Sequence, residues 1–440
     1  MPQSRILLPA VVLAALLGAA CGDRARLSEA EGSGPRPTLP EPKESLLPRV
    51  NIAPARGWPA GAVPAAAPGL QVSRYAEGLV HPRWLLALPN GDVLVAETDA
   101  PPKPATDNTL TGRIEAFVMK RAGSGEGSAN RITLLRDADG DGVAELRTAF
   151  LENLNSPFGM ALVNGRLYIA NTDAVVSVAY TDGQQRATGT PTRLAELPAG
   201  PINRHWTKSL IASADGSRLY VGVGANSNVG EAGLEVERQR AAILEIDTAS
   251  GATRVYAEGL RNPVGLAWQP DTGALWAAVN ERDELGSDLV PDYMTAVQEG
   301  GFYGWPWSYY GQTVDARVKP PRPEMVAKAL VPDYALGAHT ASLGLAWSGA
   351  NALTAAFHEG MFVGQHGSWN RRPHSGYKVV FVKFAGGRPQ GLPVEVLGGF
   401  LDDRGNARGR PAGVAIDSRG GLLVADDVGD IVWRVRAAAP

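Results

Sequence analysis

Short runs of alternating apolar and polar residues, separated by turn residues, recur along the chain from Leu70 onward. The stretch from Gly259 to Val279 shows the pattern fully: it opens with the turn Arg261-Asn262-Pro263, alternates, and turns again between Pro270 and Gly273. A second short apolar run, Ala274 to Val279, then follows. Two alternating strands around a tight turn predict a β-hairpin.

The same phrase of turn, strand, turn and strand recurs across residues 78–98, 153–173, 203–225, 259–280, 339–368 and 409–427. A third apolar run follows most copies: Arg113 to Val118, Val175 to Ala179, Ala242 to Ile246, Lys378 to Phe384 and Ile431 to Val435. This repetition predicts an all-β fold, a six-bladed β-propeller with embellished inter-blade loops. A β-sandwich or two barrels are the alternatives, but neither requires one phrase to recur. The 52 glycines and 33 prolines agree with a chain rich in turns.

In a propeller, the loops that open the innermost strands converge on one end of the central channel. The positions that open the phrases are therefore expected to meet there: Arg83, Ser156, His205, Asn262, Ser342 and Pro411. His205 in such a loop is either a structural or a catalytic histidine. Arg261 and Asn262 are either a turn cap or polar groups of a site.

Cations recur at neighbouring positions: Arg83, Lys208, Arg371, Arg372, Lys378 and Arg410. Cations gathered around one pocket repel one another unless an anion lies among them. The pattern therefore predicts a polyanionic ligand or cofactor, with Lys208 and Arg410 among the residues that hold it. The formal net charge of −3 provides no basic surface for nucleic acid, so that class of partner is not expected.

Four acidic residues, Asp137, Asp139, Asp141 and Glu145, lie around Gly142 in a segment expected to be an insertion between blades. Carboxylates at the first, third, fifth and ninth positions, with a glycine at the sixth, match the first part of a calcium loop. The twelfth-position glutamate of such loops is missing. The segment is therefore either a structural Ca²⁺ site or a loop of Asx turns.

Residues 1–20 have the pattern of a signal peptide, with Arg5, the apolar stretch Ile6 to Leu17, and small residues before Cys21. Cys21 is the expected acceptor of a lipid anchor, and ordinary cleavage nearby is the alternative. Residues 21–69, rich in Pro, Ala, Gly and charge, are expected to be a flexible tether. The sequence thus predicts an exported protein of the periplasm or cell envelope, attached to the membrane through Cys21 alone, with its catalytic propeller at residues 70–440.

Longer motifs carry a resemblance to a known family. They are GLRNPVGLAW, VNERDELGSDLVPDY, GGFYGWPWSYYG, GQHGSWNRRPHSGYKVVFV, and GRPAGVAID through LLVADDVGDIVWRV. Together they resemble the sorbosone dehydrogenase family of aldose dehydrogenases that depend on pyrroloquinoline quinone (PQQ). More distantly, the chain is similar to soluble PQQ glucose dehydrogenases, six-bladed propellers with PQQ and Ca²⁺ at the channel mouth.

The resemblance implies an enzyme that oxidises an aldose, a sorbosone-like aldehyde or a related sugar or alcohol, and passes electrons to an external quinone or cytochrome. It implies that His205 is the general base, that Arg261 is catalytic and, like Asn262, contacts PQQ, and that Arg371 and Lys378 hold the PQQ carboxylates. It also implies that the main-chain carbonyls of Glu281 and Arg282 bind a catalytic Ca²⁺, although the relatives have Gly-Pro there. A neutral imidazole suits proton removal, and arginine suits carboxylates.

Two other classes of function stay open. A calcium-dependent lactonase or other hydrolase on a propeller would need a central cluster of amides and carboxylates, for which Asn155, Asn262, Asn280 and Asp426 are the candidates. A lipoprotein that binds a glycan or a protein through one face of the propeller is the non-enzymatic alternative.

Overall fold

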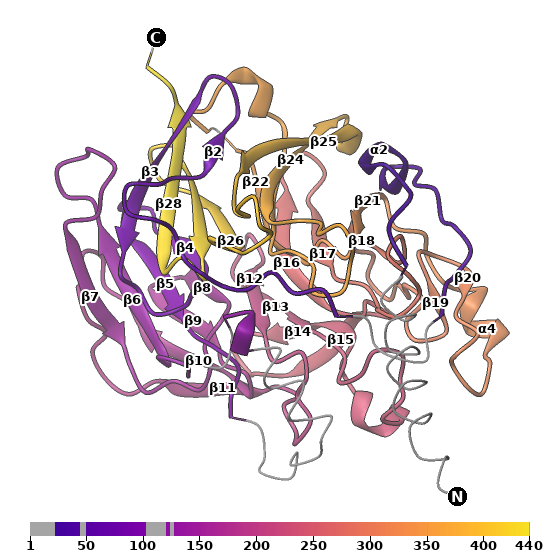
Figure 1. Ribbon diagram of the computed structural model, residues 1–440. Coiled ribbons are helices and arrows are strands. Elements are labelled where there is room, and N and C mark those ends of the chain that lie inside the picture. The colour runs from indigo at the N-terminus through magenta and orange to yellow at the C-terminus, as the bar shows by residue number, and fades with distance from the viewer. Residues whose placement is uncertain (1–22, 45–49, 103–119, 124–126, 350, 440) are drawn as a thin grey trace, which may run out of the picture.

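The computed structural model describes residues 23–44, 50–102, 120–123, 127–349 and 351–439. In this part of the chain, six antiparallel sheets of four or five strands are arranged radially around a centre, as Figure 1 shows. The all-β fold and the six-bladed propeller predicted from the sequence are confirmed. Residues 1–22, with the predicted signal peptide and Cys21, lie outside the described residues.

The first three blades follow one another along the chain. Blade 1 comprises β4 (Pro82–Ala87), β5 (Val93–Glu97), β6 (Arg131–Arg136) and β7 (Leu146–Leu151). Blade 2 comprises β8 (Met160–Val163), β9 (Arg166–Ala170), β10 (Ala174–Ala179) and β11 (Thr192–Glu196). Blade 3 comprises β12 (Lys208–Ala212), β13 (Arg218–Val223), β14 (Ala242–Asp247) and β15 (Thr253–Glu258).

The last three blades take in residues from both ends of the chain. Blade 4 comprises β16 (Pro263–Gln269), β17 (Ala274–Val279), β18 (Pro291–Ala296) and β21 (Tyr334–Ala338), with β1 (Ser33–Gly34) at its edge. Blade 5 comprises β22 (Ser342–Trp347), β23 (Gly360–Gln365), β24 (Lys378–Ala385) and β25 (Arg388–Gly398), with β2 (Ala65–Ala66) at its edge. Blade 6 comprises β26 (Pro411–Ile416), β27 (Leu422–Asp426), β28 (Ile431–Ala437) and β3 (Leu70–Glu77).

Small elements complete the described chain. They are the strands β19 (Ser308–Tyr309) and β20 (Thr313–Val314), the helices α2 (Glu29–Gly32) and α4 (Pro323–Val326), and the 3₁₀ turns η1 (Leu234–Glu237) and η2 (Ala355–Phe357). No helix within the described residues has both the length and the apolar character needed to cross a membrane.

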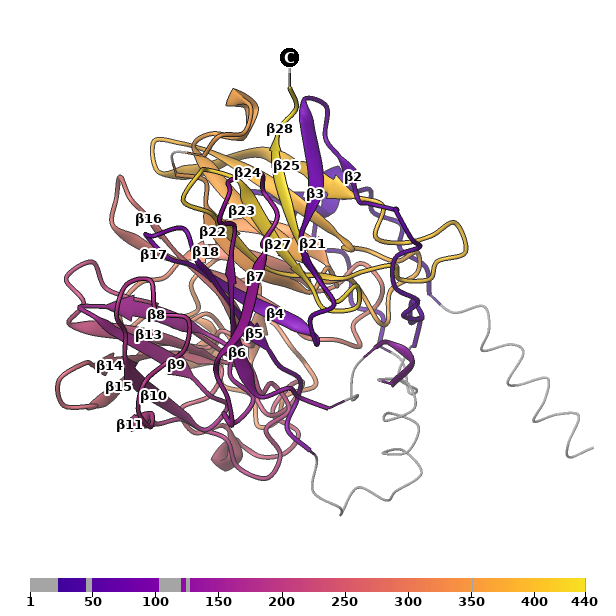
Figure 2. The ribbon, with the colours of Figure 1, turned by 90° about the vertical axis from the view of Figure 1, so that its left-hand side faces the viewer.

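The ring closes because β3 pairs antiparallel with β28, so that strands from opposite ends of the propeller share blade 6 (Figure 2). This pairing leaves no open edge between the first and the last blade. Apolar clusters fill the spaces between neighbouring blades. Phe150 of blade 1 and Phe158 at the entry to blade 2, for example, are 2% and 0% exposed in one such cluster.

Glycines at the start of the inner strands explain part of the repeated phrase. A Cβ on Gly344 of β22 would lie 2.3 Å from the carbonyl oxygen of Ala412 in the next inner strand. A Cβ on Gly159, just before β8, would lie 2.1 Å from the amide nitrogen of Leu210. The inner strands approach so closely at these points that any larger residue would push the blades apart.

The third strand of blade 1 differs from the expectation. The run Arg113 to Val118 was expected there, but β6 (Arg131–Arg136) is the strand that pairs with β5. Residues 113–118 lie outside the described residues. The other predicted third runs correspond to β10, β14, β24 and β28, and the predicted strand Ala274–Val279 is β17.

Residues 23–44 and 50–69 lie against the propeller, where the composition favoured a flexible tether. β1 pairs with β21, and β2 pairs with β25. The amide of Ser287 also donates to the Asp23 carboxylate (2.6 Å). Pairings of two residues leave no periodic pattern in the sequence, so composition alone did not indicate that this segment packs on the blades.

Candidate functional site

Two sets of loops meet at one end of the channel. Each inner strand begins at this end, and the antiparallel second strand returns to it. The site therefore contains the residues that open each phrase and also those that follow each second strand. The sequence analysis considered the first set. From the second set it named Glu281, Arg282, Asn280, Arg371 and Arg372 but overlooked Asn228, Asp283, His366 and Asp427.

His205 lies in the loop that enters β12, and its ring keeps partial exposure. Its Nδ1 lies 2.5 Å from the carbonyl oxygen of Ala225, which follows β13. A carbonyl can only accept, so Nδ1 carries the hydrogen, and in the neutral ring Nε2 has the free lone pair. This hydrogen bond leaves Nε2 as the atom that can take a proton from a substrate.

Burial lowers the pKa of His205 well below its usual value, and the charge of Arg261 lowers it further, although the bond to Ala225 opposes this. Arg240 adds to the lowering and also fastens the loop, because its Nη2 donates to the His205 carbonyl oxygen (2.9 Å). His205 is therefore neutral at pH 7, as a general base must be.

The side chains of Asn262 and His205 both pack against the backbone of Gly224. A Cβ on Gly224 would lie 2.2 Å from Oδ1 of Asn262 and 2.6 Å from Cβ of His205. The Asn262 Oδ1 atom is buried and has no hydrogen-bond partner among the described residues. The structure thus brings two of the predicted site residues together and leaves one polar atom available.

The Arg261 guanidinium is 6% exposed and is held at three of its nitrogens. Nη1 donates to the Glu281 carbonyl (2.5 Å) and Nη2 donates to Asn228 Oδ1 (3.0 Å). Nη2 also lies 3.4 Å from Asp283 Oδ2, and Nε lies 3.4 Å from the Asn228 carbonyl. Burial lowers the pKa of Arg261, while the Asp283 and Glu281 carboxylates counteract this.

Of the two carbonyls predicted to bind a catalytic Ca²⁺, those of Glu281 and Arg282, the Glu281 carbonyl is already used in this arrangement. The Glu281 carbonyl already accepts from the Arg261 guanidinium. The Arg282 guanidinium is fully buried and donates to the carbonyls of Pro306 (2.8 Å) and Ser308 (2.6 Å). Both guanidinium groups are paired with carboxylates, Arg261 with Asp283 (3.4 Å) and Arg282 with Glu281 (3.0 Å) and Asp315 (3.2 Å). A cation at the Glu281 carbonyl would therefore have to displace the Arg261 donor.

A second group of basic residues comes from blades 1, 5 and 6. Arg83 Nη1 and His366 Nε2 both contact Oδ2 of Asp427, His366 at 2.7 Å. Burial and the charges of Arg83 and Arg410 lower the pKa of His366 to about 4, although Asp427 partly opposes this. Arg410 stacks over the Tyr377 ring, 4.9 Å from its centroid.

Two cations of this second group have donors to spare. The Nε atoms of Arg83 and Arg410 are buried and have no partner within the described ranges. These two atoms are unused donors on blades 1 and 6, and Asn262 Oδ1 is an unused acceptor on blade 4, at the same end of the channel. This donor set fits a planar ligand with several carboxylates, as PQQ is.

Three predicted cofactor cations are not arranged as a ring around the channel. Lys208 is fully buried, with Nζ 3.1 Å from the Trp206 carbonyl, and burial holds its pKa well below its usual value. Arg371 donates to the Ser287 carbonyl (2.9 Å). Lys378, on the third strand of blade 5, is paired with Glu29 of α2 at 2.7 Å. Of the six cations in the pattern, Arg83 and Arg410 are the two that lie in the second basic group.

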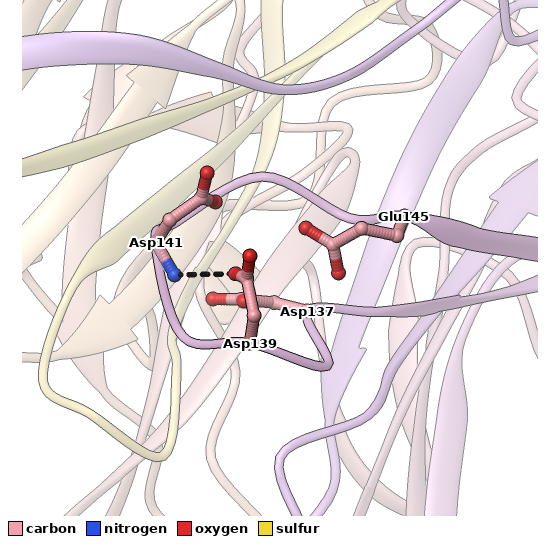
Figure 3. A group of neighbouring side chains, drawn as sticks. All are labelled: Asp137, Asp139, Asp141 and Glu145. Atoms are coloured by element: carbon pink, nitrogen blue, oxygen red, sulfur yellow. Dashed lines mark hydrogen bonds between the residues drawn. The ribbon is translucent and has the colours of Figure 1, made fainter.

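The acidic loop joins β6 to β7 within blade 1, instead of lying between blades, and is at the end of the propeller opposite His205. The carboxylates of Asp137, Asp139, Asp141 and Glu145 lie within 4.8 Å of one another (Figure 3). Asp139 accepts from the amide of Asp141 (3.0 Å), and Arg419 pairs with Asp137 (2.6 Å). Four such oxygens fit Ca²⁺, and its role at this end would be structural.

The residues considered for a hydrolase do not form a cluster. Asn155 is exposed, and the Asn280 side chain donates to the Ser342 carbonyl. The Asp426 carboxylate is fully buried and accepts from the indoles of Trp58 (2.7 Å) and Trp433 (3.0 Å). In the described part of the chain, the acidic loop is the one group of three or more His, Cys, Asp and Glu side chains close enough to share a metal.

Comparisons with known proteins identify a family model, one relative and several solved structures with the same fold. The family model described as TrAA12-like matches residues 125–298 and 326–437. An uncharacterized protein from Borreliella burgdorferi is 24% identical over 294 residues, which are 64% of this chain and 76% of that protein.

Several solved structures share the fold. The PQQ domain of pyranose dehydrogenase from Coprinopsis cinerea, in its holo form, has 20% identity and a TM-score of 0.68, covering 88% of this chain and 99% of that one. A calcium structure of the Trichoderma reesei family AA12 enzyme has 17% identity and a TM-score of 0.68, covering 89% and 99%. The PQQ-bound aldose sugar dehydrogenase from Streptomyces coelicolor has 19% identity and a TM-score of 0.53, covering 84% and 100%.

Proposed function

From the premise that the chain belongs to the TrAA12-like family, we propose that it is a PQQ-dependent oxidoreductase that oxidises a sugar or a related alcohol. The observation that carries the proposal is the fixed tautomer of His205, whose Nδ1 is committed to the Ala225 carbonyl at 2.5 Å. This leaves an unprotonated Nε2 beside Arg261 and Asn262.

The residues of the chain would act as follows. His205 accepts the proton of the substrate hydroxyl at Nε2. Arg261 adds to the effect of burial in keeping His205 neutral, and it stabilises negative charge that develops close to it. Asn262 orients the ligand through its unused Oδ1. Arg83 and Arg410, with their unused Nε donors, would hold carboxylates of PQQ, which supplies the two-electron acceptor when bound.

The motifs quoted from the sequence support a finer proposal, that the chain belongs to the sorbosone dehydrogenase branch and acts on an aldose or a sorbosone-like aldehyde. Its electrons would go to an external quinone or cytochrome. Export to the periplasm or cell envelope, with a lipid on Cys21, is proposed from the pattern of residues 1–21 alone.

The test has a binding step and a turnover step. Titration of the apoprotein with PQQ should give a saturable spectral change, and a panel of aldoses and alcohols should then reduce an artificial acceptor. His205→Gln should bind PQQ normally, but its turnover rate should be at least about 100-fold lower, since general bases contribute at least that much. His358→Gln, whose ring contacts the Leu353 carbonyl near η2, is the matched control. If PQQ fails to bind, or if His205→Gln turns over at the normal rate, the proposal is wrong.

A further inference from the structure

His339 lies between two acceptors just before β22. Its Nε2 is 2.8 Å from the Gly286 carbonyl oxygen, and its Nδ1 is 3.3 Å from Asp283 Oδ1. Neither acceptor can donate, so both ring nitrogens must carry hydrogen for both contacts to be favourable. His339 is only 8% exposed, and this geometry requires the imidazolium form.

Asp283 is the carboxylate that compensates this charge, and loops of three blades converge on it. Its Oδ1 also accepts from Asn370 Nδ2 (2.8 Å), which lies between β23 and β24. Its main chain is held by Asn228, which accepts from the Asp283 amide (2.9 Å) and donates to its carbonyl (3.2 Å). The position of Asp283 is therefore set by blades 3, 4 and 5 together.

The other oxygen of Asp283 faces Arg261. Asp283 Oδ2 and Asn228 Oδ1 both lie next to Nη2, at 3.4 and 3.0 Å. With the Glu281 carbonyl on Nη1, these contacts fix the plane of the guanidinium. A guanidinium has a rigid, planar set of donors, so fixing its partners fixes its direction.

We propose that Asp283, held in place by His339, is a positioning residue that orients the Arg261 guanidinium beside His205. The pair does not touch the substrate; it acts through Arg261. The catalytic meaning of this arrangement rests on the proposed function, but the placement of Arg261 relative to His205 can be measured without cofactor.

The variants are Asp283→Asn, which removes the charge but keeps the shape, and His339→Gln. NMR titration of the His205 ring in the apoprotein reports where Arg261 lies, because the cations that face His205 are Arg261, Arg240 and Arg204. In both variants Arg261 should move away, so the His205 pKa should rise toward its ordinary value. PQQ should bind about tenfold more weakly, since a truncated buried ion pair leaves its partner uncompensated.

Asp417→Asn is the matched control, because Asp417 is 8% exposed and paired with Arg434 (2.6 Å) at the other end of the propeller. It should change neither the His205 pKa nor the PQQ affinity. Thermal unfolding will show whether each variant is folded. If Asp283→Asn is not folded, Asn370→Ala takes its place in the experiment. An unchanged or lowered His205 pKa in folded variants overturns the proposal. Failure of the wild type to bind PQQ instead refutes the proposed function and leaves the NMR result to be judged separately.

Discussion

The indole N–H of Trp58 donates to the buried carboxylate of Asp426 at 2.7 Å. Trp58 also packs edge-on against Phe400 and Trp433, with ring centroids 5.4 and 5.2 Å apart. The residue belongs to the segment expected to be a tether, yet it completes the packing of blade 6. This contact makes the segment part of the folded unit.

Trp58→Phe should therefore destabilise the protein by about 1–2 kcal/mol, because Asp426 Oδ2 loses one of its two indole donors in a buried place. Urea unfolding followed by tryptophan fluorescence measures the change. Trp369→Phe is the control, since that indole is 38% exposed and should change stability by less than about 0.5 kcal/mol. Equal stability of Trp58→Phe and the wild type would show that the segment is only loosely attached.

Gly224→Ala should separate His205 from Asn262, because the new Cβ would lie 2.2 Å from Asn262 Oδ1 and 2.6 Å from His205 Cβ. We expect kcat/KM to fall by about tenfold or more, since small displacements of catalytic groups are costly. Steady-state kinetics with the best sugar of the panel measures the loss. Gly32→Ala, at the end of α2 where a Cβ meets no atom within 4 Å and the backbone is not left-handed, controls for general effects of the substitution. Undiminished kcat/KM in Gly224→Ala would mean that the two side chains need not meet.

The sequence was sufficient to predict the repeat and the hairpin of β16 and β17, because alternation and turn residues are local signals. It was also sufficient to select His205, Arg261 and Asn262 as residues of one mouth. It was not sufficient for the cluster of Asp283 and His339, which lie on different loops and meet only because the blades close into a ring. The ion pair of Lys378 could not be predicted for a related reason: its partner, Glu29, comes from a distant segment that folds back onto blade 5.

The pH dependence of kcat/KM should follow the protonation of His205 in the free enzyme. Burial and the charge of Arg261 hold the His205 pKa below the ordinary value of 6.5, so activity should be constant from about pH 8 to about pH 6.5 and fall only at lower pH. Arg261→Gln removes one of these charges, and the acid limb should then move to higher pH. A limb that stays in place in this variant would show that burial alone sets the pKa.

Stability should also depend on pH, through His366. Burial lowers the pKa of His366 to about 4, so between about pH 6.5 and pH 4 the unfolded chain binds a proton that the folded chain does not. The free energy of unfolding should therefore decrease as the pH is lowered from about 6.5 to about 4. His366 alone should account for a decrease of up to about 3 kcal/mol. Urea unfolding at several pH values tests this, and His366→Gln should make the slope shallower. An equal slope in the variant would assign the pH dependence to other groups.

The acidic loop between β6 and β7 allows a test of calcium that is separate from catalysis. Millimolar Ca²⁺ should raise the melting temperature by a few degrees, because an ion that binds only the folded state stabilises it. The double variant Asp139→Asn/Asp141→Asn should lose this rise. Asp182→Asn, at an exposed residue between β10 and β11 of blade 2, should keep it. PQQ affinity should not change in any of the three proteins, since the loop lies at the end opposite His205 and Arg261 already occupies the Glu281 carbonyl. A rise that persists in the double variant would place the calcium elsewhere. No rise in the wild type would mean that the Asx turns and the Arg419–Asp137 pair hold the loop without a metal.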